Sequence, residues 1–146
     1  MNQTLLVAQL NGRRIAMAAS QIESIVEISK ITPVPQTPDY IEGLSTLRSK
    51  ALTVINCARV LKINRDHSQA DTDRQAAVVH HAGHDYALLL DAVEDVVETQ
   101  NVPEEILGGV GDEWSDVALG IVETEIGPAL MVNVEAFITV KSDTAH

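Results

Sequence analysis

Three histidines lie close together in the sequence, and histidine is the commonest metal ligand in proteins. They are His80, His81 and His84, which lie in or beside Ala82-Gly83-His84-Asp85, a stretch that we predict to be a hairpin turn. Neighbouring strand residues point to opposite faces, so at most one of His80 and His81 could join His84 across the turn. No cysteine is nearby to complete a zinc site. We therefore interpret the histidines as surface residues and expect no metal and no cofactor.

Paired carboxylates are the next candidates for chemistry, because general acid–base catalysis uses two carboxyl groups placed across a cleft. The pairs here are adjacent in the sequence: Glu94-Asp95, Glu104-Glu105 and Asp112-Glu113. Adjacent residues do not face each other across a cleft, and with 3% aromatic residues the chain offers no platform for a sugar. The pattern predicts a solvated acidic surface and no catalytic residues.

A glycine-rich stretch, Leu107 to Ser115 (LGGVGDEWS), carries the only tryptophan. It matches neither GxGxxG nor a Walker pattern, since no lysine follows and the local charge is negative. One alternative stays open: a small hydrolytic or ligand-binding barrel with its site at Asp112, Glu113 and Trp114. An enclosed pocket containing those acids would support that alternative.

Arg48 is the residue for which a functional role competes best with a structural one. It is an isolated arginine among apolar residues, in the sequence Leu47-Arg48-Ser49. Its planar guanidinium can pin a local turn by donating to backbone carbonyls, or bind a partner's carboxylate in a bidentate manner. The two roles are compatible, so both remain open.

The stretch that must position Arg48 runs from Ile31 to Leu61 and begins with an extended, proline-rich crossing. Gly43 then permits a tight turn or the close approach of another backbone. Leu52 to Ile55 is predicted to be a strand, followed by a short helix from Asn56 to Leu61 with Asn56 as its N-cap. The expected buried strand positions are Leu44, Leu47, Leu52, Val54 and Ile55.

Hairpins dominate the rest of the chain. Predicted strands are Thr4 to Leu10 and Arg13 to Ala18 around Asn11-Gly12, Ala76 to His80 and Tyr86 to Leu90, and Val117 to Val122 and Ala129 to Val132. Asn133 is expected to cap a helix from Val134 to Ile138. The continuous Leu88-Leu89-Leu90 run indicates burial on both faces. Ile22, Ile25 and Val26 have helical spacing before an extended Glu27-Ile28, so helix and strand are hard to separate there, and residues 63–74 are predicted to form a loop.

Composition bounds the class of protein. With 146 residues, 45% of them hydrophobic and few aromatic, the chain suits one globular, mainly β unit of sandwich or barrel type.

The charge is unevenly distributed along the chain. Residues 1–75 hold nine of the 10 Lys and Arg residues and seven of the 21 Asp and Glu residues. Residues 76–146 hold one Lys and fourteen Asp and Glu residues. This charge argues against nucleic acid and anionic membranes as partners. No signal-peptide or membrane-spanning run is present, so a cytoplasmic location is expected, and Cys57 is predicted to be a buried thiol.

The central stretch also carries a family resemblance. The segment TPVPQTPDYIEG (32–43), then Leu47-Arg48, then ALTVINCARVL (51–61) resembles the CheW-like family, the coupling proteins of bacterial chemotaxis arrays. Leu90 to Val96 (LDAVEDV) resembles a further family segment, and the similarity extends from about Leu5 to Val140. The chain departs from the family pattern at Ser49, Thr53, Asn56 and Ala58, where glycine, proline, aspartate and a second arginine are usual.

The resemblance implies two small SH3-like five-stranded β-barrels, packed over a shared core with short helices, in one CheW-like domain spanning residues 1–146 with its core at about 4–140. It implies a non-catalytic adaptor that couples the cytoplasmic tip of a chemoreceptor (a methyl-accepting chemotaxis protein) to the regulatory domain of a CheA-type histidine kinase. Other CheW-like proteins are further implied partners. An adaptor of a different kinase pathway, such as one for surface motility, is the alternative.

The resemblance also implies which residues bind partners. Gly43, Leu47 and Arg48 match the receptor- and kinase-coupling surface, and Ile25 and Glu27 match the family's VxEI element, which is tied to partner binding. A receptor's helical hairpin would lay apolar side chains into a groove around Ile25, Gly43 and Leu47, with Arg48 fixing its orientation. Core packing is the alternative role for Ile25 and Leu47.

Overall fold

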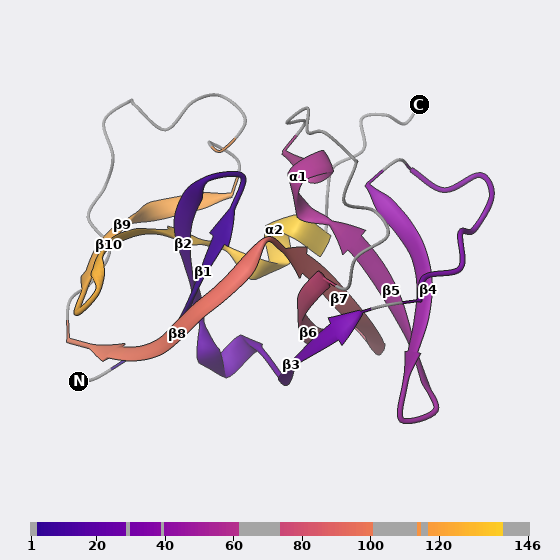
Figure 1. The fold of residues 1–146 in the computed structure, drawn as a ribbon, viewed down its shortest axis with the longest axis horizontal. Coiled ribbons are helices and arrows are strands. Elements are labelled where there is room, and N and C mark those ends of the chain that lie inside the picture. Colours follow the sequence, from indigo (N-terminus) through magenta and orange to yellow (C-terminus); the bar gives the residue numbers. More distant parts are fainter. Residues whose placement is uncertain are drawn as a thin grey trace.

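The computed structural model describes residues 3–28, 30–38, 40–61, 74–100, 114 and 117–138. Within these residues, ten strands form two five-stranded sheets of mainly antiparallel strands, which lie side by side as two curled lobes (Figure 1). We call these sheets the first and second barrel. Their arrangement confirms the predicted mainly β fold.

The first barrel is built from both ends of the described chain. Its strands follow the order β8-β1-β2-β10-β9. They are β1 (Gln3–Leu10), β2 (Arg13–Ala18), β8 (Ala92–Thr99), β9 (Ala118–Thr124) and β10 (Gly127–Val132). β2 and β10 run parallel, with Ile15 opposite Leu130, whereas the other pairs are antiparallel. The Thr99 hydroxyl donates to the Glu123 carbonyl at 3.1 Å, which joins the edge strands β8 and β9.

The second barrel is built from the middle of the chain, in the order β3-β6-β7-β5-β4. Its strands are β3 (Ser24–Ile28), β4 (Ile41–Leu47), β5 (Lys50–Asn56), β6 (Arg74–His81) and β7 (His84–Leu90). β5 and β7 are parallel. Two backbone hydrogen bonds between Thr32 and Leu44, of 2.8 and 2.9 Å, bring the segment after β3 against the edge strand β4.

Three apolar clusters explain why the barrels pack together. One cluster fills each barrel, and the largest lies between them, containing residues from β1, β2, β5, β6, β7, β10 and both α-helices. Strands at the junction contribute to two clusters because their side chains alternate between faces. Leu88 and Leu90 point to the shared core, whereas Ala87 and Leu89 point into the second barrel. The prediction that this run is buried on both faces is therefore confirmed.

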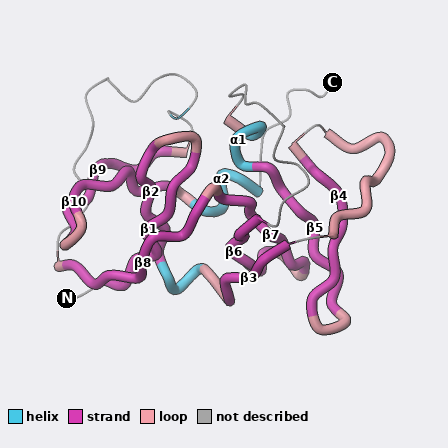
Figure 2. Tube along the Cα trace, in the orientation of Figure 1, coloured by secondary structure: helices cyan, strands magenta, loops and turns pink. Residues whose placement is uncertain are grey.

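The helices are short and follow strands (Figure 2). They are the 3-10 helix η1 (Ala19–Gln21) and the α-helices α1 (Cys57–Val60) and α2 (Val134–Ile138). The Asn56 carboxamide accepts from the Arg59 N–H at 3.2 Å, and the Asn133 carboxamide accepts from the Glu135 N–H at 3.1 Å. Both predicted N-caps are thus confirmed. In the part of the chain that the structure describes, no helix is long and apolar enough to cross a bilayer.

Two sequence expectations are resolved or corrected by the fold. Residues 24–28 form strand β3, after η1, so the helical spacing of Ile22, Ile25 and Val26 did not indicate a helix. Leu44 was expected to be buried but is 41% exposed. The inward positions of β4 are Gly43, Ser45 and Leu47, and strand alternation therefore turns Leu44 outward. The predicted loop at 63–74 lies outside the described residues apart from its last residue, and so does the glycine-rich stretch apart from Trp114.

Candidate partner-docking site

Gly43 is where the proline-rich segment crosses β4. Gly43 is buried with φ +147°, and a Cβ added to it would overlap the Thr32 carbonyl oxygen and lie 2.7 Å from the Thr32 carbonyl carbon. The two backbones can approach this closely only because residue 43 has no side chain. Of the two roles predicted for Gly43, the structure therefore shows the close approach of another backbone.

Arg48 and Ser49 form the two-residue turn between β4 and β5. Both have positive φ, 53° and 69° respectively, as the common two-residue hairpin turns of type I′ require. Glycine and asparagine are the usual residues in such turns, so this tip is strained; the sequence indicated a turn at Arg48 but not its two-residue form with positive φ. The result is an arginine at the tip of the β4–β5 hairpin.

The Arg48 side chain is exposed and has no hydrogen bond or ion pair within the part of the chain that the structure describes. It does not pin its own turn through a backbone carbonyl, which was one of the two roles considered from the sequence. A pocket of about 270 Å³ lies beneath it. Its lining consists of Glu23, Ser24, Leu47, Arg48, Lys50, Leu52, Val78 and Asp85. Residues at the start of β3 and at the tip of the β4–β5 hairpin thus line the same pocket.

The remaining predicted residues lie on β3 and β4 of the second barrel. Ile25 and Glu27 are alternate residues of β3 and both are exposed, with Ile25 37% accessible. Ile25 is therefore not a core residue. Leu47 is half-buried: it packs against the core of the second barrel and also lines the pocket. Its position therefore suits both core packing and contact with a partner. The five predicted residues thus comprise a buried glycine, a half-buried leucine and three exposed side chains.

Sequence reasoning missed one polar cluster close to β4. The Asn56 amide donates to the Glu42 carboxylate at 2.7 Å, and the Arg59 guanidinium lies 3.7 Å from the same carboxylate oxygen. Asn56 stands where the family usually has aspartate, and it donates a hydrogen bond that an aspartate could not. Nothing local in the sequence links residues 42 and 56, because they become neighbours only through the pairing of β4 with β5.

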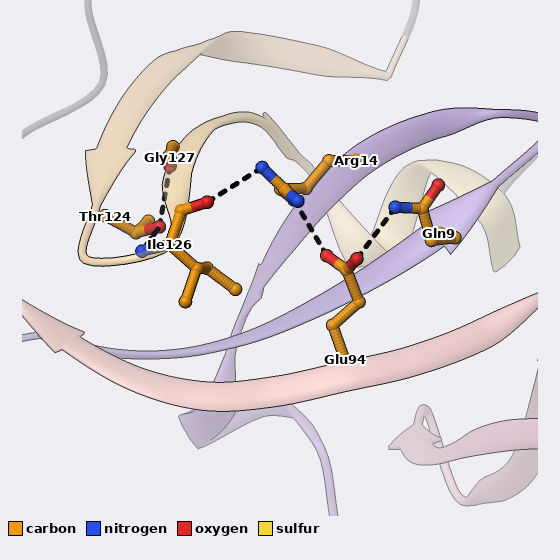
Figure 3. A network of polar contacts seen from close by, with 6 residues as sticks. All are labelled: Gln9, Arg14, Glu94, Thr124, Ile126 and Gly127. Atoms are coloured by element: carbon orange, nitrogen blue, oxygen red, sulfur yellow. Dashed lines mark hydrogen bonds and ion pairs between the residues drawn. The ribbon is translucent and has the colours of Figure 1, made fainter.

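A second polar network stabilises the opposite barrel (Figure 3). Arg14 donates to Glu94 at 2.8 Å and to the Ile126 carbonyl at 2.9 Å, while Gln9 donates to the other Glu94 oxygen at 2.8 Å. The hydrogen bonds from Arg14 and Gln9 lower the pKa of Glu94. Gly127 has φ +116°, and an added Cβ there would lie 2.9 Å from the Arg14 guanidinium. This network ties β1, β2 and β8 to the turn before β10.

Two further sequence predictions concern buried residues. Cys57 is buried in the shared core, and its burial raises the pKa of the thiol, as expected of a structural cysteine. Trp114 is only 5% exposed in the same core, with the Arg13 guanidinium 5.1 Å from its ring centre. Its ring is therefore unavailable to line an open ligand site. The neighbouring Asp112 and Glu113, proposed with it for such a site, lie outside the described residues.

The geometry defines a class of protein, a pair of packed SH3-like β-barrels with an arginine hairpin at one end. The crystal structure of the scaffolding protein TtCheW from Thermoanaerobacter tengcongensis has this fold: the two chains match with a TM-score of 0.79 at 22% identity, over 97% of this chain and 95% of that one. The model of the CheW-like domain family matches residues 4–142. The chain therefore belongs to the CheW-like domain family.

Relatives with assigned names agree with that membership. The chemotaxis protein CheW of Thermotoga maritima is 28% identical over 122 residues, which cover 83% of this chain and 78% of the relative. The chemotaxis protein CheW of Bacillus subtilis is 23% identical over 107 residues, covering 70% and 67%. Membership places this chain among non-catalytic scaffold proteins rather than enzymes.

Proposed function

We propose that this protein is an adaptor of chemotaxis-type signalling in the cytoplasm, which couples the cytoplasmic tip of a chemoreceptor to the regulatory domain of a CheA-type histidine kinase. Its partner-binding residues are Ile25, Glu27, Gly43, Leu47 and Arg48. The observation that carries the proposal is the exposed Arg48 at a strained hairpin tip, above a pocket that Leu47 also lines.

Four of these residues have separate tasks in this arrangement. Arg48 offers a planar, unoccupied guanidinium to a partner carboxylate, and pre-organisation of the turn lowers the entropic cost of binding. Ile25 supplies an exposed apolar contact, and Leu47 forms part of the pocket floor. Gly43 acts indirectly, because its missing side chain lets the Thr32 segment lie against β4 and so fixes the hairpin. The receptor tip, a helical hairpin, would bind by laying apolar side chains into this surface.

The test is a binding measurement with purified full-length protein, the receptor tip and the kinase regulatory domain. Arg48→Ala should weaken receptor binding by at least about tenfold, and Arg48→Glu further, as expected for a charged anchor residue. Glu125→Lys is the matched control, since it reverses an exposed charge at a turn of the other barrel. If Arg48→Glu remains folded and binds as tightly as the control, Arg48 is not an anchor.

The same measurement decides between signalling pathways. Receptor tips and kinase domains from flagellar chemotaxis and from surface-motility systems should be compared side by side. The chain should bind one pair at least about tenfold more tightly, because specificity is a difference between affinities. Failure of a folded protein to bind any receptor tip or kinase regulatory domain would refute the adaptor role itself.

A further inference from the structure

Three potential metal ligands meet on one end of the second barrel, although they are far apart in the sequence. They are Glu23, His80 and Asp85, and one ligand atom from each lies within 4.8 Å of the others. His80 was considered as a ligand from the sequence, but only in combination with His84. The structure instead pairs it with Asp85, and adds Glu23 from the segment before β3.

The backbone holds these three residues in place. His80 and Asp85 are directly opposite each other in the β6–β7 ladder. The Glu23 N–H donates to the Val78 carbonyl at 2.7 Å, which fixes the start of β3 beside β6. All three side chains therefore project from hydrogen-bonded neighbouring segments rather than from separate loops. Such pre-organisation lowers the cost of assembling a site.

The spacing also suits coordination. The His80 Nδ1 lies 2.8 Å from the Asp85 Oδ1. Ligand atoms that share one ion through bonds of about 2.0–2.2 Å lie about 3.0–3.5 Å apart, so this pair needs only a small adjustment. Glu23 is exposed and lines two pockets, one of about 250 Å³ that His80 also lines and one of about 270 Å³ that Asp85 also lines. Water molecules in these pockets could complete the coordination.

We propose that Glu23, His80 and Asp85 form an open binding site for a divalent first-row transition-metal ion such as Zn²⁺. One imidazole and two carboxylates are a donor set that suits these ions, whereas Mg²⁺ and Ca²⁺ prefer oxygen ligands alone. The ion would take the place of the hydrogen bond between His80 Nδ1 and Asp85 Oδ1, since metal ligands bind in their deprotonated form.

The positive charge of Lys50 lies close to this site, and its removal provides a test of metal binding. Its Nζ lies 3.6 Å from Oδ2 of Asp85, the oxygen that does not contact His80. The ammonium would repel a bound cation, so the site is weaker than its ligand set alone would give. Removing the charge with Lys50→Gln should therefore strengthen metal binding, whereas a non-specific ion on an acidic surface would respond only weakly.

The experiment is a titration of the chelator-treated, full-length protein with Zn²⁺ by calorimetry and with Co²⁺ by visible absorption. We expect one ion per chain. His80→Ala and Glu23→Gln should each weaken binding by at least about tenfold. Mutation of a residue that only hydrogen-bonds to a metal ligand already lowers metal affinity by about that factor. His84→Ala is the matched control, an exposed histidine of the same hairpin, and should leave affinity unchanged.

Two outcomes would overturn the site. One is the absence of saturable binding by the folded protein at millimolar metal concentrations; the other is binding that His84→Ala weakens as much as His80→Ala. Glu23 and Asp85 also line the pocket beneath Arg48, so a bound ion would add positive charge to the docking face. That consequence depends on the proposed function, but the titration does not, because it uses no partner protein.

Discussion

Replacing Gly43 with alanine tests whether the crossing of the Thr32 segment holds the docking hairpin in place. The added methyl group cannot coexist with the Thr32 carbonyl, so the segment must move away from β4. That movement breaks the two Thr32–Leu44 hydrogen bonds, which are together worth about 1–3 kcal/mol. The φ of +147° costs a residue with a side chain about another 1–2 kcal/mol. We expect Gly43→Ala to destabilise the protein by about 3 kcal/mol.

The comparison that isolates the steric part is Gly12→Ala. Gly12 has φ +80° but no atom within 4 Å of an added Cβ, so alanine there meets only the backbone strain, about 1–2 kcal/mol. Urea unfolding followed by the fluorescence of Trp114 and by circular dichroism measures both variants. Equal destabilisation of the two variants, within about 0.5 kcal/mol, would refute the argument that the Thr32 backbone requires glycine at position 43.

Three other substitutions give distinct expectations. Ser49→Gly should raise stability by about 0.5–1 kcal/mol, because it relieves the positive φ of 69° at the hairpin tip, and thermal unfolding should show a higher midpoint. Asn56→Asp should destabilise by about 1–2 kcal/mol at pH 7, since it sets a second carboxylate against Glu42, and by less at pH 4. The pKa of Glu94 in the folded protein is lowered from its ordinary value of 4.5, so the ionised carboxylate should contribute to stability above pH 4.5. This contribution should disappear as the pH falls through the lowered pKa. Unfolding of wild type and Glu94→Gln from pH 7 to pH 3 measures it.

Each of these has its own control or refuting result. Ala51→Gly lies in the adjacent strand, where glycine should destabilise, so Ser49→Gly and Ala51→Gly should shift the midpoint in opposite directions. An Asn56→Asp variant whose deficit is the same at pH 4 and pH 7 would rule out carboxylate repulsion as its cause. For Glu94, a stability difference from Glu94→Gln that stays constant from pH 7 to pH 3 would mean that the Arg14 contact contributes nothing.

Local features of the fold were predictable because neighbouring residues determine them. Asn11-Gly12 forms a turn with both φ values positive, and Asn56 and Asn133 cap helices, all as their residue types indicate. The positive φ values of the Arg48-Ser49 turn were not predictable, since neither residue favours that conformation. Leu44 was wrongly placed in the core because hydrophobicity does not reveal which face of an edge strand is inward.

Long-range features required the structure or the family resemblance. The parallel pairing of β2 with β10 and of β5 with β7 joins segments with no shared local signal. The same is true of side chains that meet only through those sheets. Glu42 reaches Asn56 and Arg59, and Glu23 reaches His80, through strand pairing rather than sequence spacing. The five partner-binding residues came from the resemblance, and stay a proposal.

The division of the strands between the barrels has a consequence for synthesis of the chain. During translation, β3 to β7 emerge as a continuous block, so the second barrel has all its strands before β8 leaves the ribosome. β1 and β2 emerge first but must wait for β8 and β10, their neighbours on either side. Until then the face of the N-terminal hairpin that carries Leu5, Val7 and Ala16 lacks its partners from β8, β9 and β10, and chaperones that hold nascent chains are expected to bind there.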